Sequence, residues 1–185
     1  MEFNNEYYFE NLKNVLDNLC QDSLQDAIKE IRNAWLDGVK IVTCGNGGSA
    51  IIGSHYVNDW VKSSDKSNGN KLRGFCLSDN VGLVTAYAND IRYEEIYSEQ
   101  CKALLDKNDL LIVISGSGNS QNIIKALEEA NNLGAKTLAI LGFNGGNAIN
   151  YAHKSLVVPS HDMQICEDIF MIFGHLVMKQ LSNAS

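Results

Sequence analysis

The chain has 185 residues, of which 45% are hydrophobic and 20% charged, and this length and composition are typical of one globular domain. Its formal net charge is −7, from 15 basic and 22 acidic residues, so the positive surface that nucleic-acid binding needs is not expected. A domain of this length buries roughly 70% of its unfolded surface, which predicts a core that is stable without disulfides.

Residues 1–37 are predicted to form two amphipathic helices. Apolar residues recur at three- and four-residue spacing over 8–19 and again over 24–35, before Gly38. The first helix also carries apolar side chains outside its main stripe: Phe3, Tyr7 and Phe9. We expect these helices to pack in a homo-oligomer, with packing on the chain's own sheet as the alternative.

Residues 38–185 are predicted to form an α/β core. Short apolar runs indicate buried strands at 40–44, 72–77, 110–115, 137–141 and 155–158. Helices are expected between and after them, at 49–63, 81–88, 92–106, 120–133 and 163–182, with a polar loop at 63–70. Strands that alternate with helices pair in parallel and are covered on both faces. The sequence therefore predicts a single domain, 1–185, built as a three-layer αβα sandwich around a five-stranded parallel sheet.

The N-terminus and the cysteines predict a cytoplasmic protein with no membrane anchor. Glu2, Glu6 and Glu10 lie where a signal peptide would need positive charge followed by an unbroken apolar run. The cysteines are widely spaced and form no C-x-x-C pair, which is typical of reduced thiols.

Two loops rich in glycine, serine and asparagine follow the first and third predicted strands. They span residues 44–49 (CGNGGS) and 115–120 (SGSGNS), and each leads into a helix. Glycines let the backbone approach a ligand, a helix N-terminus offers free N–H groups, and hydroxyls can hold an anion without a cation. Either loop alone is often only a tight turn. Together, at the carboxyl ends of strands, they favour a phosphate site.

Nucleotide binding is the alternative for these loops. Residues 45–50 formally fit G-x-G-x-x-G/A, but the acidic residue expected about 20 residues further on is displaced to Asp79. The chain has no G-K-[ST] motif, so a nucleoside triphosphate would meet no P-loop lysine. We therefore favour a phosphorylated small molecule over a dinucleotide.

These motifs give the sequence a resemblance to the sugar isomerase (SIS) domain family, and within it to the phosphoheptose isomerases. The resemblance covers nearly the whole chain and rests on CGNGGS with His55 seven positions after Gly48, on Asn89-Asp90, on the loop ending SGNS and on Gly145-Gly146. It implies a flavodoxin-like fold and a homo-oligomer, expected to be a tetramer. It also implies an isomerase that interconverts sedoheptulose 7-phosphate and a D-glycero-D-manno-heptose 7-phosphate type aldose, for heptose in surface polysaccharide.

The resemblance also implies site residues. Asp59 would be the general base and His175 the general acid. Zinc would be bound by His55, Asp59, Glu167 and His175. The sugar phosphate would be contacted by Asn46, Gly47, Gly48, Ser49, Asn89, Asp90, Ser115, Gly116, Ser117, Ser120 and Glu167.

The residue types and their spacing are compatible with such a metal site. His55 and Asp59 are four residues apart and so share one helix face. Two imidazoles and two carboxylates make a zinc-type ligand set. Glu167 and His175 are separated by about 12 Å along a helix. A single metal between them therefore requires both side chains to lean inward, or a ligand from another subunit.

Several positions depart from the family pattern. The family has Glu at the position of Asp59, Gln at that of Glu167 and Thr at that of Gly116. Ile165 stands where an Arg is common, and Met163 replaces a small polar residue. The shorter Asp59 loses roughly 1.5 Å of reach, and Gly116 removes one hydroxyl donor from the second loop.

A non-catalytic protein is the alternative function. Some SIS relatives bind a phosphosugar or a replication initiator and keep the fold without the catalytic residues. This chain keeps both His55 and His175 and acidic side chains at both carboxylate positions. A site that no longer catalyses a reaction would be expected to lose these residues, so an enzymatic function is the favoured hypothesis.

Overall fold

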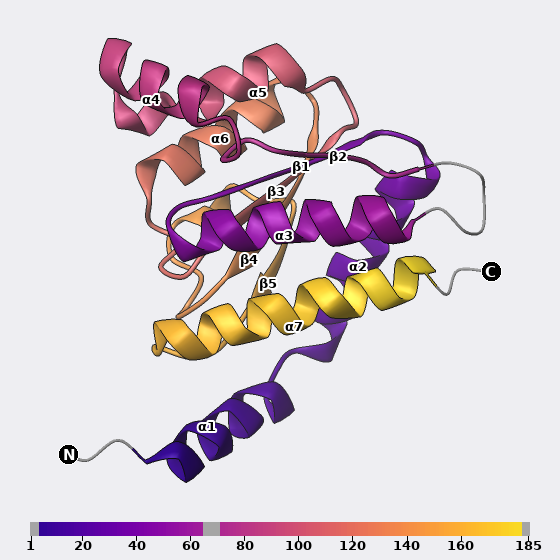
Figure 1. The fold of residues 1–185 in the computed structure, drawn as a ribbon, viewed down its shortest axis with the longest axis vertical. Helices are drawn as coiled ribbons and strands as arrows, with labels where there is room; N and C mark the ends of the chain where they lie inside the picture. Colours follow the sequence, from indigo (N-terminus) through magenta and orange to yellow (C-terminus); the bar gives the residue numbers. More distant parts are fainter. Residues whose placement is uncertain (1–3, 65–70, 183–185) are drawn as a thin grey trace.

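A five-stranded parallel sheet forms the centre of the structure, a computed structural model that describes residues 4–64 and 71–182 (Figure 1). Its strands, in the spatial order β2-β1-β3-β4-β5, all pair in parallel. Their bounds are β1 Lys40–Gly45, β2 Arg73–Cys76, β3 Leu110–Ser115, β4 Lys136–Leu141 and β5 Lys154–Val157. This flavodoxin-like order confirms the predicted sheet.

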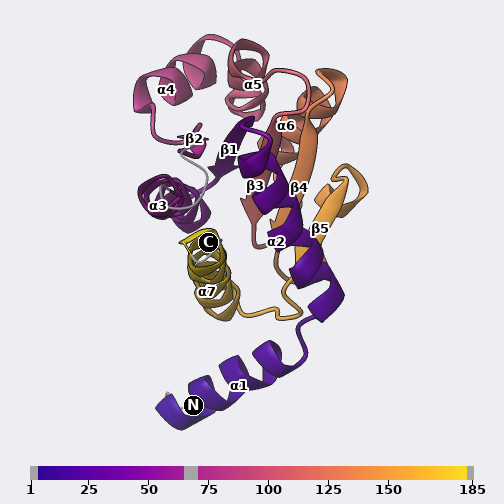
Figure 2. The same ribbon diagram turned by 90° about the vertical axis from the view of Figure 1, so that its right-hand side faces the viewer.

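Helices cover both faces of this sheet (Figure 2). Successive strand residues point to opposite faces, so Ile41 and Val42 belong to two different buried clusters. The first cluster joins the sheet to α2 (Gln21–Leu36), α3 (Gly48–Ser63) and α7 (Met163–Ser182). The second joins it to α4 (Val81–Asp90), α5 (Ser98–Leu104) and α6 (Gln121–Asn132). The three-layer αβα sandwich is therefore confirmed.

The two leading helices behave differently. Helix α2 packs on the sheet beside β5 and β1, as in the alternative left open by the sequence. Helix α1 (Asn5–Asp17) lies against α7 instead, where the Tyr8 hydroxyl donates to Asp168 Oδ2 at 2.7 Å. On the outer side of α1, Tyr7 and Phe9 are 69% and 66% exposed, while Phe3 lies outside the described residues. No described helix is long and apolar enough to cross a membrane.

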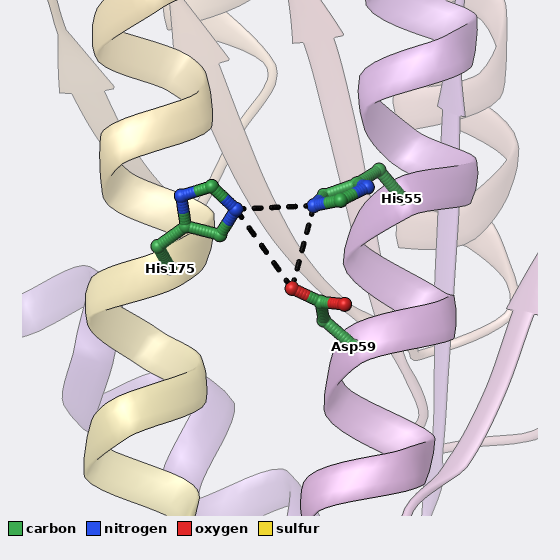
Figure 3. Close-up of side chains that lie close together, drawn as sticks. All are labelled: His55, Asp59 and His175. Atoms are coloured by element: carbon green, nitrogen blue, oxygen red, sulfur yellow. Dashed lines mark hydrogen bonds and ion pairs between the residues drawn. The ribbon is translucent and has the colours of Figure 1, made fainter.

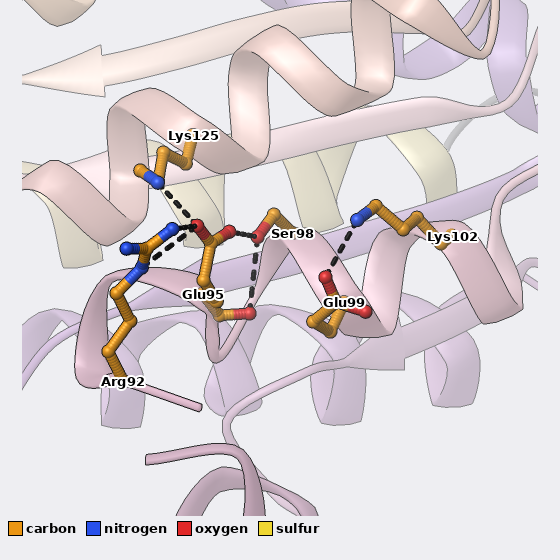
Figure 4. A network of polar contacts seen from close by, with 6 residues as sticks. All are labelled: Arg92, Glu95, Ser98, Glu99, Lys102 and Lys125. Carbon is orange, nitrogen blue, oxygen red and sulfur yellow. Dashed lines mark hydrogen bonds and ion pairs between the residues drawn. The ribbon is translucent and has the colours of Figure 1, made fainter. Parts of the chain in front are cut away.

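The prediction of one continuous helix over 92–106 is wrong. The segment forms a 3-10 turn, η1 (Tyr93–Glu95), followed by the short helix α5. The turn is held by the Glu95 carboxylate, which accepts hydrogen bonds from Arg92 and Ser98 and pairs with Lys125 on α6 (Figure 4). A second 3-10 turn, η2 (Ala148–Asn150), precedes β5. Of the predicted loop 63–70, residues 65–70 lie outside the described residues.

Candidate active site

The two glycine-rich loops lie side by side at the carboxyl edge of the sheet. They follow the neighbouring strands β1 and β3, whose connections run over opposite faces, so the loops flank the point where the strand order reverses. Both loops contribute to one cavity of about 190 Å³. Its lining residues are Asn46, Ser49, Ile114, Ser115, Gly116, Ser117, Ser120, Met163 and Glu167. Most of the predicted substrate contacts are thus brought together.

The first loop ends at the N-terminus of α3, and its positions 47 and 48 require glycine for two different reasons. Gly47 has φ +54°, a conformation that L side chains rarely adopt. At Gly48 the space is taken, because an added Cβ would lie 2.4 Å from Glu167 Oε1. The Glu167 carboxylate therefore rests on the first turn of α3, where the helix dipole favours negative charge.

The second loop leaves donors free for an anion. Ser115 Oγ accepts a hydrogen bond from the Gly118 N–H at 3.1 Å, and Ser117 Oγ accepts one from Asn119 N–H at 3.3 Å. Ser120 is the N-cap of α6, yet its side chain does not cap the helix. Its hydroxyl and the first N–H groups of α6 can therefore donate to a ligand in the cavity.

A third loop, residues 142–147, packs against the second loop and forms hydrogen bonds with it. The N–H of Ala148 donates to Gly118 O at 2.8 Å, and the N–H of Asn147 donates to Asn119 Oδ1 at 3.0 Å. The two loops are so close that a Cβ on Gly118 would lie 2.1 Å from the Gly145 carbonyl oxygen. A Cβ on Gly146 would in turn lie 2.2 Å from the Ser117 carbonyl oxygen, so the close packing of these loops requires glycine at both 118 and 146.

Two of the departures from the family pattern are neighbours in space. A Cβ on Gly116 would lie 2.3 Å from Met163 Sδ and 2.5 Å from Met163 Cε. The methionine at the start of α7 occupies the space that a larger residue at 116 would need. The hydroxyl missing at position 116 is therefore coupled to the apolar side chain at 163, and both line the cavity.

His55, Asp59 and His175 form a compact group between α3 and α7, which lie side by side (Figures 1 and 3). The two histidine Nε2 atoms are 3.1 Å apart. Asp59 Oδ2 lies 3.3 Å from His55 Nε2 and 3.8 Å from His175 Nε2. The side chains are 22–51% exposed, so this group is open to solvent. The structure therefore unites both predicted catalytic residues with a second imidazole.

The same group fits a divalent metal ion. Metal–ligand bonds of 2.0–2.1 Å in a tetrahedral site place neighbouring ligand atoms about 3.3 Å apart, close to the 3.1–3.8 Å separations of this group. Glu167, the fourth expected ligand, does not belong to the group whose ligand atoms lie within 4.8 Å of one another. It lines the loop cavity instead.

Asn89 and Asp90 lie apart from the loops of the same chain. Both are exposed at the end of α4, where Asn89 Nδ2 donates to Asp90 Oδ1 at 2.8 Å. Neither is among the residues that line the loop cavity.

The sequence reasoning missed the side chains that hold the first loop. Ser78 donates to the Gly45 carbonyl at 3.2 Å, and the Tyr97 hydroxyl donates to the same oxygen. Burial raises the pKa of the Tyr97 phenol, so it stays a donor. Asn122, 1% exposed on α6, pairs with the Asn46 side chain. The sequence feature that could have predicted the role of Asn122 is an asparagine on the apolar face of a helix that directly follows a ligand loop.

Comparison with known proteins gives a consistent result. The SIS domain family matches residues 7–142. The phosphoheptose isomerase of Aliarcobacter butzleri is 36% identical over 163 residues, 88% of this chain and 86% of that protein. That of Helicobacter pylori strain P12 is 36% identical over 160 residues, 84% and 83% of the two chains.

Solved structures extend the comparison to the fold. A phosphoheptose isomerase from Francisella tularensis is 27% identical and covers 95% of both chains, with a TM-score of 0.86. One from Neisseria gonorrhoeae is 23% identical and covers 97% of both chains, with a TM-score of 0.88. The arrangement of strands and helices is therefore shared along almost the whole chain.

Proposed function

This chain belongs to the SIS domain family, and we propose on that premise that it is an aldose–ketose isomerase of the phosphoheptose type. It interconverts sedoheptulose 7-phosphate and a D-glycero-D-manno-heptose 7-phosphate type aldose, which supplies heptose for surface polysaccharide. The observation that carries this proposal is the convergence of His55, Asp59 and His175 on the two helices, α3 and α7, whose first turns line the serine-rich cavity.

The phosphate end of the substrate fits the second loop. Ser117 and Ser120, the N-cap of α6, line the cavity. Hydroxyl and backbone N–H donors at a helix N-terminus bind phosphate without a cation. Because the Glu167 carboxylate shares the cavity, the phosphate is expected on the α6 side of it.

The distance between this cavity and the two imidazoles suits a long sugar. His55 comes six residues after Ser49 on α3, which is about 9 Å along the helix axis. His175 comes eight residues after Glu167 on α7, which is about 12 Å. An extended seven-carbon ketose phosphate, with bonds of about 1.5 Å, spans roughly 10 Å, whereas a three-carbon one spans about half of that. A six- or seven-carbon substrate can therefore reach both ends.

The chemistry at the far end is proton transfer. Asp59 accepts the proton from the carbon next to the carbonyl, and returns it to the neighbouring carbon when the product forms. His175 donates a proton to the carbonyl oxygen and recovers one from the adjacent hydroxyl, so the enediol-like charge is neutralised as it develops. Asn58 Nδ2 donates to Asp59 Oδ1 at 3.1 Å, which leaves Oδ2 directed at the imidazoles.

We also propose that the group binds zinc. His55, Asp59 and His175 would supply three ligands, and the fourth position would remain for another subunit or the substrate. A bound zinc ion would polarise a sugar oxygen as a Lewis acid.

A homo-oligomer, proposed to be a tetramer, suits the exposed apolar side chains. Helix α4 has no buried residue, and Val81 and Ile91 at its ends are 68% and 51% exposed. Another subunit packed on α4 would also bring Asn89 and Asp90 near a sugar site. All five cysteines are free, which supports a reducing compartment such as the cytoplasm.

The test is turnover of ketose phosphates of three, five, six and seven carbons, with and without added zinc. We expect the seven-carbon substrate to be converted fastest. Asp59→Asn should lower kcat by roughly 10²–10⁴-fold, the range of general acid–base catalysis. Asp37→Asn, at an exposed aspartate at the end of α2, is the matched control and should leave kcat unchanged. Binding of the sugar phosphate without turnover would instead support the non-catalytic alternative.

A further inference from the structure

We propose that Asn122 and Tyr93 are positioning residues that hold the Asn46 carboxamide so that a single N–H donor faces the loop cavity. The inference rests on the proposed function, because it assigns that donor to an oxygen of the bound sugar phosphate. It concerns side chains that lie outside the cavity lining and act through Asn46.

The Asn46 side chain is almost fully hydrogen-bonded before any ligand arrives. Its Nδ2 donates to Asn122 Oδ1 at 3.0 Å, and its Oδ1 accepts from Asn122 Nδ2 at 2.8 Å. The Tyr93 hydroxyl donates to the same Oδ1 at 2.9 Å. A carboxamide has two N–H donors and two acceptor lone pairs. One N–H therefore remains, on a residue that lines the cavity.

Asn122 is a fixed partner because it is buried. Its side chain belongs to the first turn of α6 and the residue is 1% exposed. A buried carboxamide requires hydrogen-bond partners, and the reciprocal pair with Asn46 supplies them. The pair links residues 76 positions apart in the chain, and so ties the first loop to the helix that carries the second loop. The two ligand loops are thereby held in one relative position.

Tyr93 lies in the same 3-10 turn, η1, as Glu95, whose polar contacts reach α5 and α6 (Figure 4). Glu95 Oε1 accepts from Arg92 Nη2 at 2.8 Å and pairs with Lys125 Nζ, and Oε2 accepts from Ser98 Oγ at 2.6 Å. Lys125 follows Asn122 by three residues, so both lie on one face of α6. These contacts fix the 3-10 turn that directs the Tyr93 hydroxyl to Asn46, and they explain why no regular helix forms there.

The expected effect follows from the size of one hydrogen bond. Without the Tyr93 hydroxyl, one lone pair of Asn46 Oδ1 loses its partner and the carboxamide is less strictly oriented. A neutral hydrogen bond of this kind corresponds to roughly a 2- to 12-fold change. Because the cavity lies about 10 Å from the proposed proton transfer, Tyr93→Phe should raise KM about 3- to 10-fold and change kcat less than twofold.

A double-mutant cycle separates positioning from a general structural role. Tyr93→Phe, Asn46→Ala and the double variant are compared with the parent for KM and kcat on sedoheptulose 7-phosphate. If Tyr93 acts through Asn46, Tyr93→Phe raises KM in the parent but not in the Asn46→Ala background. Tyr151→Phe, a tyrosine of 37% exposure outside this network, is the matched control and should change neither constant. An equal rise of KM in both backgrounds would overturn the proposal.

A second measurement does not depend on turnover. In ¹⁵N NMR spectra the side-chain NH₂ of Asn46 should give a resolved pair of signals with slow hydrogen exchange, since one N–H is buried against Asn122. Asn122→Leu, which removes the acceptor of that N–H as well as the donor to Asn46 Oδ1, should collapse that protection, and Tyr93→Phe should reduce it. Unchanged exchange in both variants would contradict the positioning role. A parent that converts no ketose phosphate, but shows these NMR changes, would refute the proposed reaction and leave the positioning intact.

Discussion

Replacing Gly118 by alanine tests whether the phosphate loop is held by contact with the third loop. Gly118 has φ +64°, and a side chain in this conformation costs about 1–2 kcal/mol. Its Cβ would also lie 2.1 Å from the Gly145 carbonyl oxygen and 2.7 Å from the carbonyl carbon. Both are backbone atoms, so the loops must separate, and such overpacking costs a further 1–3 kcal/mol or so. We expect a total loss of about 2–5 kcal/mol.

Gly38→Ala is the matched control for this substitution. Gly38 has a similar φ of +68°, but nothing lies within 4 Å of the position of its Cβ. It should lose only about 1–2 kcal/mol. Equilibrium unfolding in urea measures both losses, and inorganic phosphate binding reports on the loop. Phosphate should bind Gly118→Ala at least tenfold more weakly and Gly38→Ala as it binds the parent. Equal losses of stability and unchanged phosphate binding would refute the proposed loop contact.

Three further predictions address the Glu95 network, the loop cavity and the group of His55, Asp59 and His175. Lys125, with Ser98 and Arg92, lowers the pKa of Glu95 to about 2, so the stability that the Glu95 carboxylate contributes should be complete above about pH 4.5 and disappear as the pH falls through 2. In urea unfolding, Glu95→Gln should be less stable than the parent by about 1–3 kcal/mol at pH 7 and by less at pH 3. The same difference in stability at both pH values would contradict this. Gly116→Ala should destabilise the protein by about 1–3 kcal/mol, and thermal unfolding of the double variant with Met163→Ala should show a less than additive loss. Zinc should bind the parent in titration calorimetry, and its affinity should fall more than about a hundredfold in His55→Ala. Even the residues that hydrogen-bond to metal ligands contribute about 10–100-fold to metal affinity. Equal affinity in the two proteins would show that His55 is not a zinc ligand.

Much of the fold could be predicted because the strands are buried on both faces. A strand such as β4 is then a continuous apolar run, and its expected start differs from the observed Lys136 by one residue. The segment 92–106 could not be predicted in this way. Its helical periodicity is overridden by Glu95, whose partner Lys125 is 30 residues away in the chain.

In the candidate site, too, the features set by local sequence could be predicted and those set by long-range packing could not. The shared helix face of His55 and Asp59 follows from local spacing, whereas the approach of His175 to within 3.1 Å of His55 depends on how α3 and α7 pack. The resemblance to a known family supplied that pairing. The resemblance did not predict the contact between Glu167 and Gly48. Eight residues of α7 separate Glu167 from His175, so Glu167 lies at the loop-cavity end of the site, away from the imidazoles.

Proton NMR of the reaction in D₂O tests the central claim most directly. Once Asp59 has taken the proton from C1 of bound sedoheptulose 7-phosphate, its carboxyl group, 22% exposed, can exchange that proton with solvent before C2 is protonated, so part of the aldose should carry deuterium at C2. With Asp59→Asn, both the label and the product should appear at least about a hundredfold more slowly. An aldose that forms, or takes up deuterium, as fast with Asp59→Asn as with the parent would contradict the account.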